Sequence, residues 1–296
     1  MRTYSIKELE NFSGVKAHTI RIWEQRYDLL DPNRTHTGIR YYNDEDLKKM
    51  LAISVLSKSG YKISKLAKLT KADLNNELSK IENQSTVDDS TRFETYINAL
   101  LTAGVQLNEN EFIQTYEKAK NKYSTYEIYV NIVYPLLVKI GTMWGKDDIN
   151  PLQEHFVSNI IRQKMLVEVN NLRIDDSADE IVLFLPEKET HEIGLLLSNF
   201  LIRESGIKTY YFGQQVPLAN LVKFIEEKQI KKALGFIFFS QGSEKLNKML
   251  ALLSKKCPKT TFYWAGTRSA IMPLEINKNH TVIESIEDLI TKIRKN

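Results

Sequence analysis

Two kinds of apolar spacing divide the chain. From about Arg92 to Leu172 apolar residues recur three and four positions apart, as Ile128, Ile132 and Val133 do, which is typical of amphipathic helices. After a polar break at 173–179, short runs that are apolar throughout alternate with amphipathic segments. The first region predicts a bundle of about four helices, and the second predicts a parallel sheet covered by helices on both faces.

The second region predicts five strands and four helices. The apolar runs lie at 181–185, 209–212, 234–239, 261–264 and 281–283. The amphipathic segments lie at 195–204, 218–228 and 245–255, and a closing helix is expected from Ile286. This alternation is typical of a doubly wound α/β domain.

The first seventy residues predict two short helices and a hairpin. Ser5 followed by Glu8 is a capping-box pattern that begins one helix, and Ser13-Gly14 ends it. A second helix is expected from about Lys16 to Tyr27, and a Thr37-Gly38 turn then separates two extended runs. Two short helices followed by a two-stranded wing are typical of a winged helix-turn-helix that binds DNA.

A polar stretch at 75–91 has no helical apolar period from Glu82 onward, and we interpret it as a linker. The chain is therefore expected to be multidomain. The predicted parts are an all-α winged helix-turn-helix at 1–74, the linker at 75–91, a four-helix bundle at 92–174 and the doubly wound parallel sheet at 179–296.

Composition limits the class of protein. Of 296 residues 42% are hydrophobic and 26% charged, which excludes a disordered chain. No apolar run approaches the roughly 18 residues of a membrane span, and the first residues contain no secretion signal, so we expect a cytoplasmic protein without a membrane partner. A single cysteine, Cys257, excludes a disulfide within the chain and a cysteine-based zinc site.

The excess positive charge lies in the predicted DNA-binding segment. Residues 1–75 carry 14 Lys and Arg against 9 Asp and Glu, whereas residues 76–296 carry 27 against 28. Arg34 and Arg40 flank the hairpin turn, where they are suited to bidentate phosphate contacts, while base reading is expected from the second helix. In that helix we expect Ile20, Ile22 and Trp23 to pack inward. The residues predicted to contact DNA are His18, Thr19, Arg21, Arg26, Tyr27, Arg34, Arg40 and Tyr41.

Two further motifs contain histidine. Trp144 is followed after nine residues by Glu154-His155, and the first strand of the α/β region leads into Glu189-Thr190-His191-Glu192-Ile193-Gly194. A neutral imidazole at the carboxyl edge of a parallel sheet can bind a transition metal, and Glu189 could fix its tautomer. Each motif also has a purely structural interpretation, since His191 could cap a helix and Trp144 could pack with His155 in the bundle.

These residues resemble known families. The run from Thr19 to Leu30, followed by Arg34-Thr-x-Thr-Gly-Ile-Arg-Tyr-Tyr, resembles the winged helix-turn-helix of the MerR family of transcription regulators. With the two histidine motifs, the whole chain resembles the cobalamin-binding members of that family, light-responsive repressors of carotenoid genes that use adenosylcobalamin. The resemblance implies a homodimer, or a tetramer, on a near-palindromic promoter site in double-stranded DNA.

The resemblance also implies roles for single residues. His191 would be the cobalt ligand with Glu189 behind it, and Gly194, Ser240 and Gly266 would lie along the nucleotide tail of the cofactor. Trp144, Glu154 and His155 would lie over the upper axial group. The chain departs from the family pattern at Ala265, where the family has the first of two glycines, and beside Ser240, which lacks its small companion residue. Gly145 stands where some members have a histidine that ligates cobalt after photolysis.

The leading expectation is a repressor, not an enzyme, in which adenosylcobalamin and light control oligomerisation. In the alternative, the cobalamin-like domain has lost its cofactor and serves oligomerisation or partner binding, as Ala265 and the altered Ser240 element suggest. A corrinoid protein that serves a methyltransferase or mutase is a third possibility, but the chain has no substrate barrel. The acidic pairs at 88–89, 147–148 and 175–176 are expected to be solvated loop charges rather than catalytic carboxylates.

Overall fold

A computed structural model describes residues 3–83, 87–146, 148–174, 179–238, 243–274, 276 and 279–294. The chain forms two compact units, Met1–Ile160 and Ile161–Asn296. In the described ranges, the helices are all too short or too polar to cross a membrane.

The first unit begins with the predicted helix-turn-helix and wing. Its elements are α1 (Ile6–Ser13), α2 (Ala17–Tyr27), β1 (Asn33–Arg34), β2 (Arg40–Tyr41), α3 (Asp44–Lys58), α4 (Ile63–Leu66) and α5 (Lys71–Asn83). The side chain of Ser5 accepts a hydrogen bond from the backbone of Glu8, which completes the predicted capping box. Gly14, in the left-handed region at φ 73°, ends α1 as predicted.

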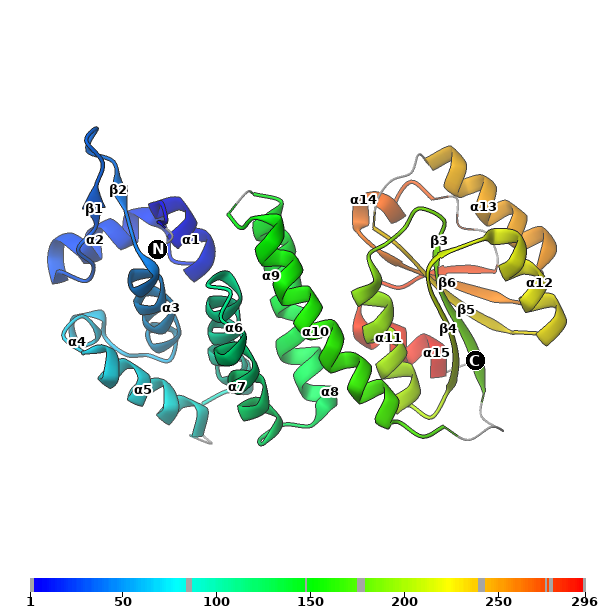
Figure 1. Cartoon of the computed structure of the whole chain (residues 1–296), viewed down its shortest axis with the longest axis horizontal. Coiled ribbons are helices and arrows are strands. Elements are labelled where there is room, and N and C mark those ends of the chain that lie inside the picture. The colour runs from blue at the N-terminus through cyan, green and yellow to red at the C-terminus, as the bar shows by residue number, and fades with distance from the viewer. Residues whose placement is uncertain are drawn as a thin grey trace. The chain divides into compact units, whose positions relative to one another are not determined.

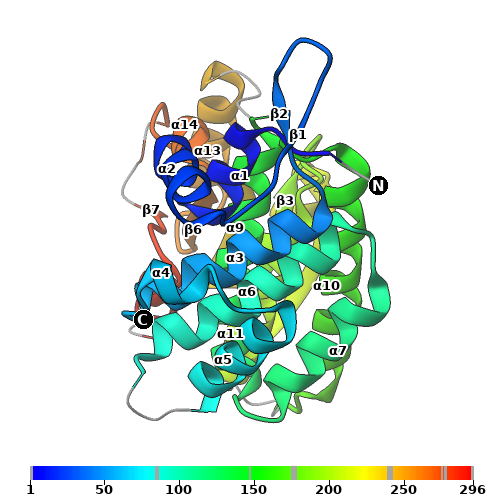
Figure 2. The same ribbon diagram turned by 90° about the vertical axis from the view of Figure 1, so that its left-hand side faces the viewer.

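The wing is a tight antiparallel hairpin. The backbone N–H of Thr35 donates to the carbonyl of Ile39 at 2.9 Å, and the turn contains Gly38 at φ 81°. The register places Arg34 directly opposite Arg40, so the two arginines lie on the same side of the hairpin. Figure 2 shows the hairpin extending beyond α1 and α2.

The stretch predicted as a linker is largely helical. Helix α5 continues to Asn83, and α6 already begins at Asp89, with Asp88 as its N-cap. The prediction of a segment without helical character was wrong at both ends. Leu74 and Ile81, two turns apart on α5, are both buried, so this polar helix packs through an apolar side. Residues 84–86 lie outside the described ranges.

Four helical segments form the predicted bundle. They are α6 (Asp89–Val105), α7 (Glu109–Lys120), a continuous run made of α8 (Thr125–Ile128), the π-helical turn η1 (Tyr129–Val133) and α9 (Tyr134–Trp144), and α10 (Pro151–Asn171). Figure 1 shows them following the helices α1 to α5, which together with the wing form the N-terminal head. Leu100 and Leu101 of α6 are buried with Ile132 and Leu136, as the three- and four-residue spacing predicted. Helix α10 continues beyond Ile160 into the second unit.

The second unit contains a five-stranded parallel sheet. Its strands are β3 (Glu180–Pro186), β4 (Lys208–Val216), β5 (Lys232–Ile237), β6 (Thr261–Gly266) and β7 (His280–Val282). Their spatial order is β4-β3-β5-β6-β7, and all pairs are parallel. The doubly wound fold predicted from the sequence is therefore confirmed. The strand order reverses between β3 and β5, and folds of this kind bind ligands outside the carboxyl ends of the strands at that reversal.

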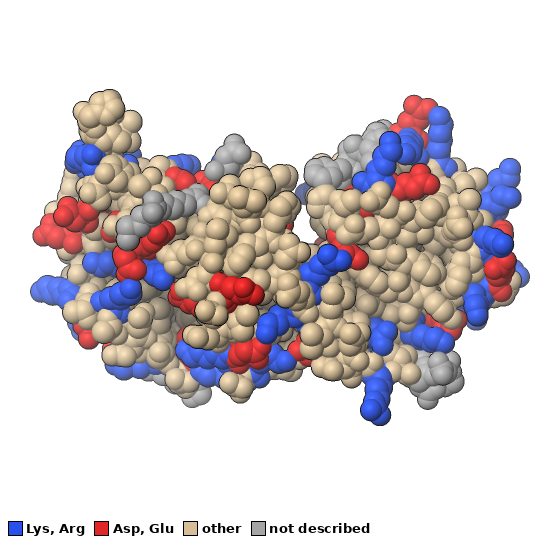
Figure 3. Space-filling view, in the orientation of Figure 1, with Lys and Arg blue, Asp and Glu red and all other residues tan. Residues whose placement is uncertain are grey.

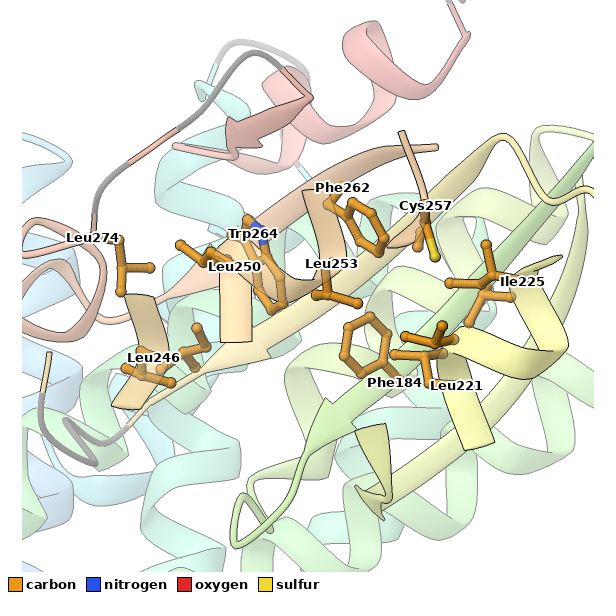
Figure 4. Packing of buried hydrophobic residues seen from close by; sticks show 14 of the residues in the cluster. Phe184, Leu221, Ile225, Leu246, Leu250, Leu253, Cys257, Phe262, Trp264 and Leu274 are labelled. Atoms are coloured by element: carbon orange, nitrogen blue, oxygen red, sulfur yellow. The ribbon is translucent and has the colours of Figure 1, made fainter. Parts of the chain in front are cut away.

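Helices cover both faces of this sheet. Helices α11 (Glu192–Glu204) and α15 (Ile286–Arg294) lie on one face, and α12 (Leu218–Lys228) and α13 (Ser243–Lys256) lie on the other, with α14 (Arg268–Ile271) near the end of β6 (Figure 1). Alternate residues of β3 enter the two cores: Ile181 and Leu183 pack with α11 and α15, whereas Phe184 packs with α12 and α13 (Figure 4). The strand is apolar throughout because neither face meets water.

Candidate cofactor and DNA-binding sites

The Glu189–His191 motif lies where the sequence placed it. Strand β3 ends at Pro186 and α11 begins at Glu192, so both residues belong to the loop between them. Since β3 is one of the two strands at the reversal of strand order, this loop lies at the carboxyl edge where doubly wound sheets bind ligands.

Glu189 anchors the loop to the sheet. Its side chain is buried, and Oε1 accepts hydrogen bonds from the backbone N–H groups of Thr190 at 3.0 Å and His191 at 3.1 Å. Oε2 accepts from the backbone N–H of Phe238, next to the end of β5, at 2.8 Å. A buried carboxylate is stable only when its oxygens are hydrogen-bonded in this way, so Glu189 fixes the loop against two neighbouring strands.

The same carboxylate sets the tautomer of His191. Nδ1 of the imidazole lies 2.5 Å from Oε1 of Glu189. Because a carboxylate accepts hydrogen bonds, Nδ1 carries the proton and Nε2 carries the lone pair that can bind a metal. The His191 side chain is 42% exposed, so it reaches solvent. These residues fit a single imidazole ligand to cobalt. No group of three or more His, Cys, Asp or Glu side chains gathers as a metal site within the described part of the chain.

Packing within the chain explains the two glycines expected along the nucleotide tail. A Cβ at Gly194 would lie 2.9 Å from the ring of Phe236 and 3.3 Å from that of Phe238. At Gly266, with φ 150°, a Cβ would lie 1.8 Å from the carbonyl oxygen of Ile237. The two phenylalanine rings stack 5.9 Å apart and fill the space beside Gly194. Ser240 lies outside the described residues.

The second histidine motif is on the surface of the bundle. Trp144 ends α9 and is 46% exposed, an uncommon environment for a tryptophan. His155, near the start of α10, is 68% exposed, and its Nδ1 lies 2.7 Å from Glu154 Oε2. The alternative that Trp144 and His155 pack inside the bundle is therefore wrong, and both side chains are open to a ligand.

The loop between Trp144 and Glu154 is attached to the N-terminal head. Asp148 is buried, and its Oδ2 accepts a hydrogen bond of 2.7 Å from Nδ2 of Asn11 on α1. The expectation of a solvated Asp148 was wrong, because its partner lies 137 positions earlier in the chain and no local pattern reveals it.

On the helix-turn-helix, the predicted DNA-contacting side chains of α2 reach the surface. His18, Arg21 and Arg26 are exposed, and Thr19 and Tyr27 are half-buried. Ile20 is buried as expected, but Ile22 is 43% exposed. The expectation for Ile22 was wrong because two residues correspond to about 200° around a helix, which places Ile22 opposite Ile20.

The two arginines of the wing differ in their exposure to solvent and in their contacts. Arg34 is exposed, whereas Arg40 is half-buried and its Nε lies 3.3 Å from Oε2 of the buried Glu24 on α2. Tyr42 donates a hydrogen bond of 2.6 Å from its hydroxyl to Glu24 Oε1, and burial together with this carboxylate raises the pKa of Tyr42. Glu24 thus ties the wing to α2, a role that sequence reasoning missed. Tyr41, between the two, is half-buried.

Two lysines beside α2 were also missed. An open hollow of about 510 Å³ at the end of α2 is lined by Arg26, Tyr27, Asp28, Ser64, Lys65, Ala67 and Lys68. The three-residue spacing of Lys65 and Lys68 places them on one side of the chain beside Arg26. Figure 3 shows Lys and Arg side chains at the base of the wing and elsewhere on the head, while the wing tip carries no charged side chain.

Family profiles match two segments of the chain. Residues 4–73 match the MerR HTH family regulatory protein, and residues 96–167 match the B12 binding domain. The first segment covers the helix-turn-helix and wing, and the second lies within the helical bundle that contains Trp144, Glu154 and His155.

Curated relatives are similar along most of the chain. The HTH-type transcriptional repressor CarH of Myxococcus xanthus is 25% identical over 270 residues, which cover 91% of this chain and 90% of the relative. The repressor CarA of the same organism is 22% identical over 221 residues, covering 74% of this chain and 71% of the relative. Both are transcription regulators rather than enzymes.

A solved structure shares the fold of about two thirds of the chain. The monomethylamine corrinoid protein of Methanosarcina barkeri aligns with a TM-score of 0.55 at 13% identity, covering 68% of this chain and 96% of that protein. The profile matches and the regulator relatives together show what kind of protein this is. The chain is a DNA-binding transcription regulator that joins a MerR helix-turn-helix domain to a B12-binding domain.

Proposed function

We propose that this protein is a transcriptional repressor whose sensor region binds adenosylcobalamin, with His191 as the lower cobalt ligand. The observation that carries the proposal is the Glu189–His191 pair, held at the carboxyl edge of the sheet beside the reversal of strand order. The B12-binding profile match and the similarity to a repressor along nine-tenths of the chain support it.

The chemistry of the chain's own residues follows from their contacts. Glu189 keeps the proton of His191 on Nδ1, so that Nε2 is the ligating atom, and the N–H of Phe238 holds Glu189 in place. Trp144, Glu154 and His155 are proposed to contact the upper face of the same cofactor. When bound, adenosylcobalamin supplies a light-labile cobalt–carbon bond. Gly145 has no side chain, so it cannot supply a histidine ligand once that bond has broken.

The DNA-binding head is proposed to act as a homodimer on a near-palindromic promoter site. His18, Arg21 and Arg26 of α2 would lie against the DNA together with Arg34 of the wing, and Arg40 would assist from its place beside Glu24. Cofactor occupancy would favour a tetramer, which brings two dimers to one operator and raises affinity through effective concentration.

Gel filtration in the dark tests cofactor binding. The full chain is mixed with adenosylcobalamin and passed over the column, and the corrin absorbance that elutes with the protein is measured. We expect co-elution with the wild type and with His36→Ala, which changes an exposed histidine of the wing tip. We expect a large loss with His191→Ala. A wild-type protein that elutes without corrin absorbance would refute the proposal.

One observation favours a second candidate function. The rings of Phe236 and Phe238 fill the space beside Gly194, and Ala265 is buried on the same face of the sheet. A domain closed in this way would serve oligomerisation or partner binding without a cofactor. Under this alternative, DNA binding is unchanged by cobalamin and by light, and the wild type carries no corrin through the column.

A further inference from the structure

A second carboxylate lies directly after the histidine. Glu192 is the first residue of α11, and its side chain is only 13% exposed. Oε1 accepts a hydrogen bond of 2.9 Å from the hydroxyl of Tyr211, and Oε2 accepts one of 3.1 Å from Nε2 of Gln214, both on β4. Nη2 of Arg162 lies 2.9 Å from the same Oε2. One carboxylate therefore connects α11, β4 and α10.

Helix α10 is attached to α11 at two places within the second unit. The first is the ion pair between Arg162 and Glu192. The second is a hydrogen bond of 3.0 Å from Nη2 of Arg203, near the end of α11, to the carbonyl of Leu172, just beyond the end of α10. The two contacts hold the C-terminal part of α10 along α11 from one end to the other.

His191 thus lies between two anchored acidic residues. Glu189 holds the loop on the sheet, through the N–H of Phe238, and Glu192 holds the start of α11 on α10, through Arg162. The backbone of His191 is fixed from both sides, and its ring is fixed by Glu189. Arg162 therefore contacts Glu192, the residue that directly follows His191 in the chain.

The ion pair between Arg162 and Glu192 can break and form again at little cost. Glu192 has two neutral hydrogen-bond donors besides Arg162, so the carboxylate keeps partners when the arginine leaves. The Arg162 side chain is 47% exposed, so water can solvate its guanidinium group. An ion pair of this kind adds little to the stability of the fold, and losing it should change the position of the loop without unfolding the domain.

We propose that Arg162 is a positioning residue for His191: acting through Glu192, it sets the orientation of the imidazole and links cobalt ligation to helix α10. The inference rests on the proposed cobalamin function. It adds a role for α10, which carries Glu154 and His155 near its start, as the element that responds to the state of the histidine loop.

Three variants of the full chain test this. Arg162→Gln removes the charge, Arg162→Lys retains it, and Arg173→Gln changes an exposed arginine just beyond α10 as a control. The dark absorption spectrum of bound adenosylcobalamin reports whether histidine ligates the cobalt, and titration gives the Kd. We expect Arg162→Gln to raise the Kd about fivefold and to lower the histidine-ligated fraction. Arg162→Lys should restore both, and the control should match wild type.

Hydrogen exchange of the cobalamin-free protein gives a readout that needs no cofactor. The amides of residues 190–194 should exchange faster in Arg162→Gln than in wild type, and Arg162→Lys should reverse the change. If the Arg162→Gln protein has the same spectrum, the same Kd and the same exchange rates as the wild type, the inference is overturned. If the wild type binds no corrinoid, the proposed function fails, whereas exchange rates still decide whether Arg162 positions the loop.

Discussion

Replacing Glu189 by glutamine tests the histidine site with the smallest change of shape. The native carboxylate is 1% exposed and accepts hydrogen bonds from Thr190, His191 and Phe238. Glutamine keeps one oxygen. If that oxygen faces His191, the amide NH₂ group faces the N–H of Phe238, and two donors oppose each other in a buried place.

The magnitude follows from these contacts. Losing one buried hydrogen bond to a charged acceptor and leaving a donor unsatisfied costs about 2–3 kcal/mol. For a chain of this size that lowers the melting temperature by roughly 3–5 °C. The hydrogen bond from Nδ1 of His191 to residue 189 also weakens, because a neutral amide oxygen is a poorer acceptor than a carboxylate. Loss of such a partner typically weakens metal affinity by about 10–100-fold.

Two assays measure the change: thermal unfolding followed by circular dichroism, and titration with adenosylcobalamin in the dark. Glu227→Gln on α12 is the control, since that carboxylate is 63% exposed and pairs only loosely with Lys223 at 3.7 Å. The control should match wild type in both assays. A Glu189→Gln protein with unchanged melting temperature and unchanged cobalamin affinity would refute the role assigned to this carboxylate.

Three further predictions concern other parts of the chain. Arg34→Ala should reduce the slope of log K against log salt for DNA binding by about 0.9, measured by fluorescence anisotropy; an unchanged slope would exclude a phosphate contact. His280 accepts a hydrogen bond of 2.8 Å from Trp264, and burial lowers the pKa of His280. Below about pH 6.5 the unfolded state takes up the proton first, so stability should fall by up to about 1.4 kcal/mol per pH unit. Urea unfolding at several pH values checks this, and a fall of the same size in His280→Asn would contradict it. Phe238→Ala should open space beside Gly194 and improve binding of cobalamin relative to cobinamide, which lacks the nucleotide tail. An unchanged ratio of the two affinities would show that the ring does not obstruct the tail.

Local sequence patterns were sufficient to predict the helices and strands and to predict the contact between Glu189 and His191. The Ser5–Glu8 capping box, the Thr37-Gly38 turn and the apolar runs of the sheet are each decided by residues close together in the chain, and the structure has them as predicted. The Glu189–His191 contact spans two residues, so the motif itself contained it.

Contacts between distant residues could not be predicted in the same way. Asp148 is buried because Asn11 meets it, and Arg40 is drawn from the surface by Glu24 on another element. The rings that close the space beside Gly194 come from β5 and the residue that follows it. In each case the sequence gives the type of side chain. The residue that it contacts depends on how whole helices and strands pack together.

Cobalamin bound through His191 is proposed to control DNA binding. The most direct measurement is the affinity for a DNA site selected by the protein from a random pool, in the dark with and without adenosylcobalamin, and again after illumination. We expect tighter DNA binding with the cofactor in the dark, weaker binding after illumination, and no effect of the cofactor on DNA binding by His191→Ala. Equal wild-type affinity under all three conditions would contradict this proposal.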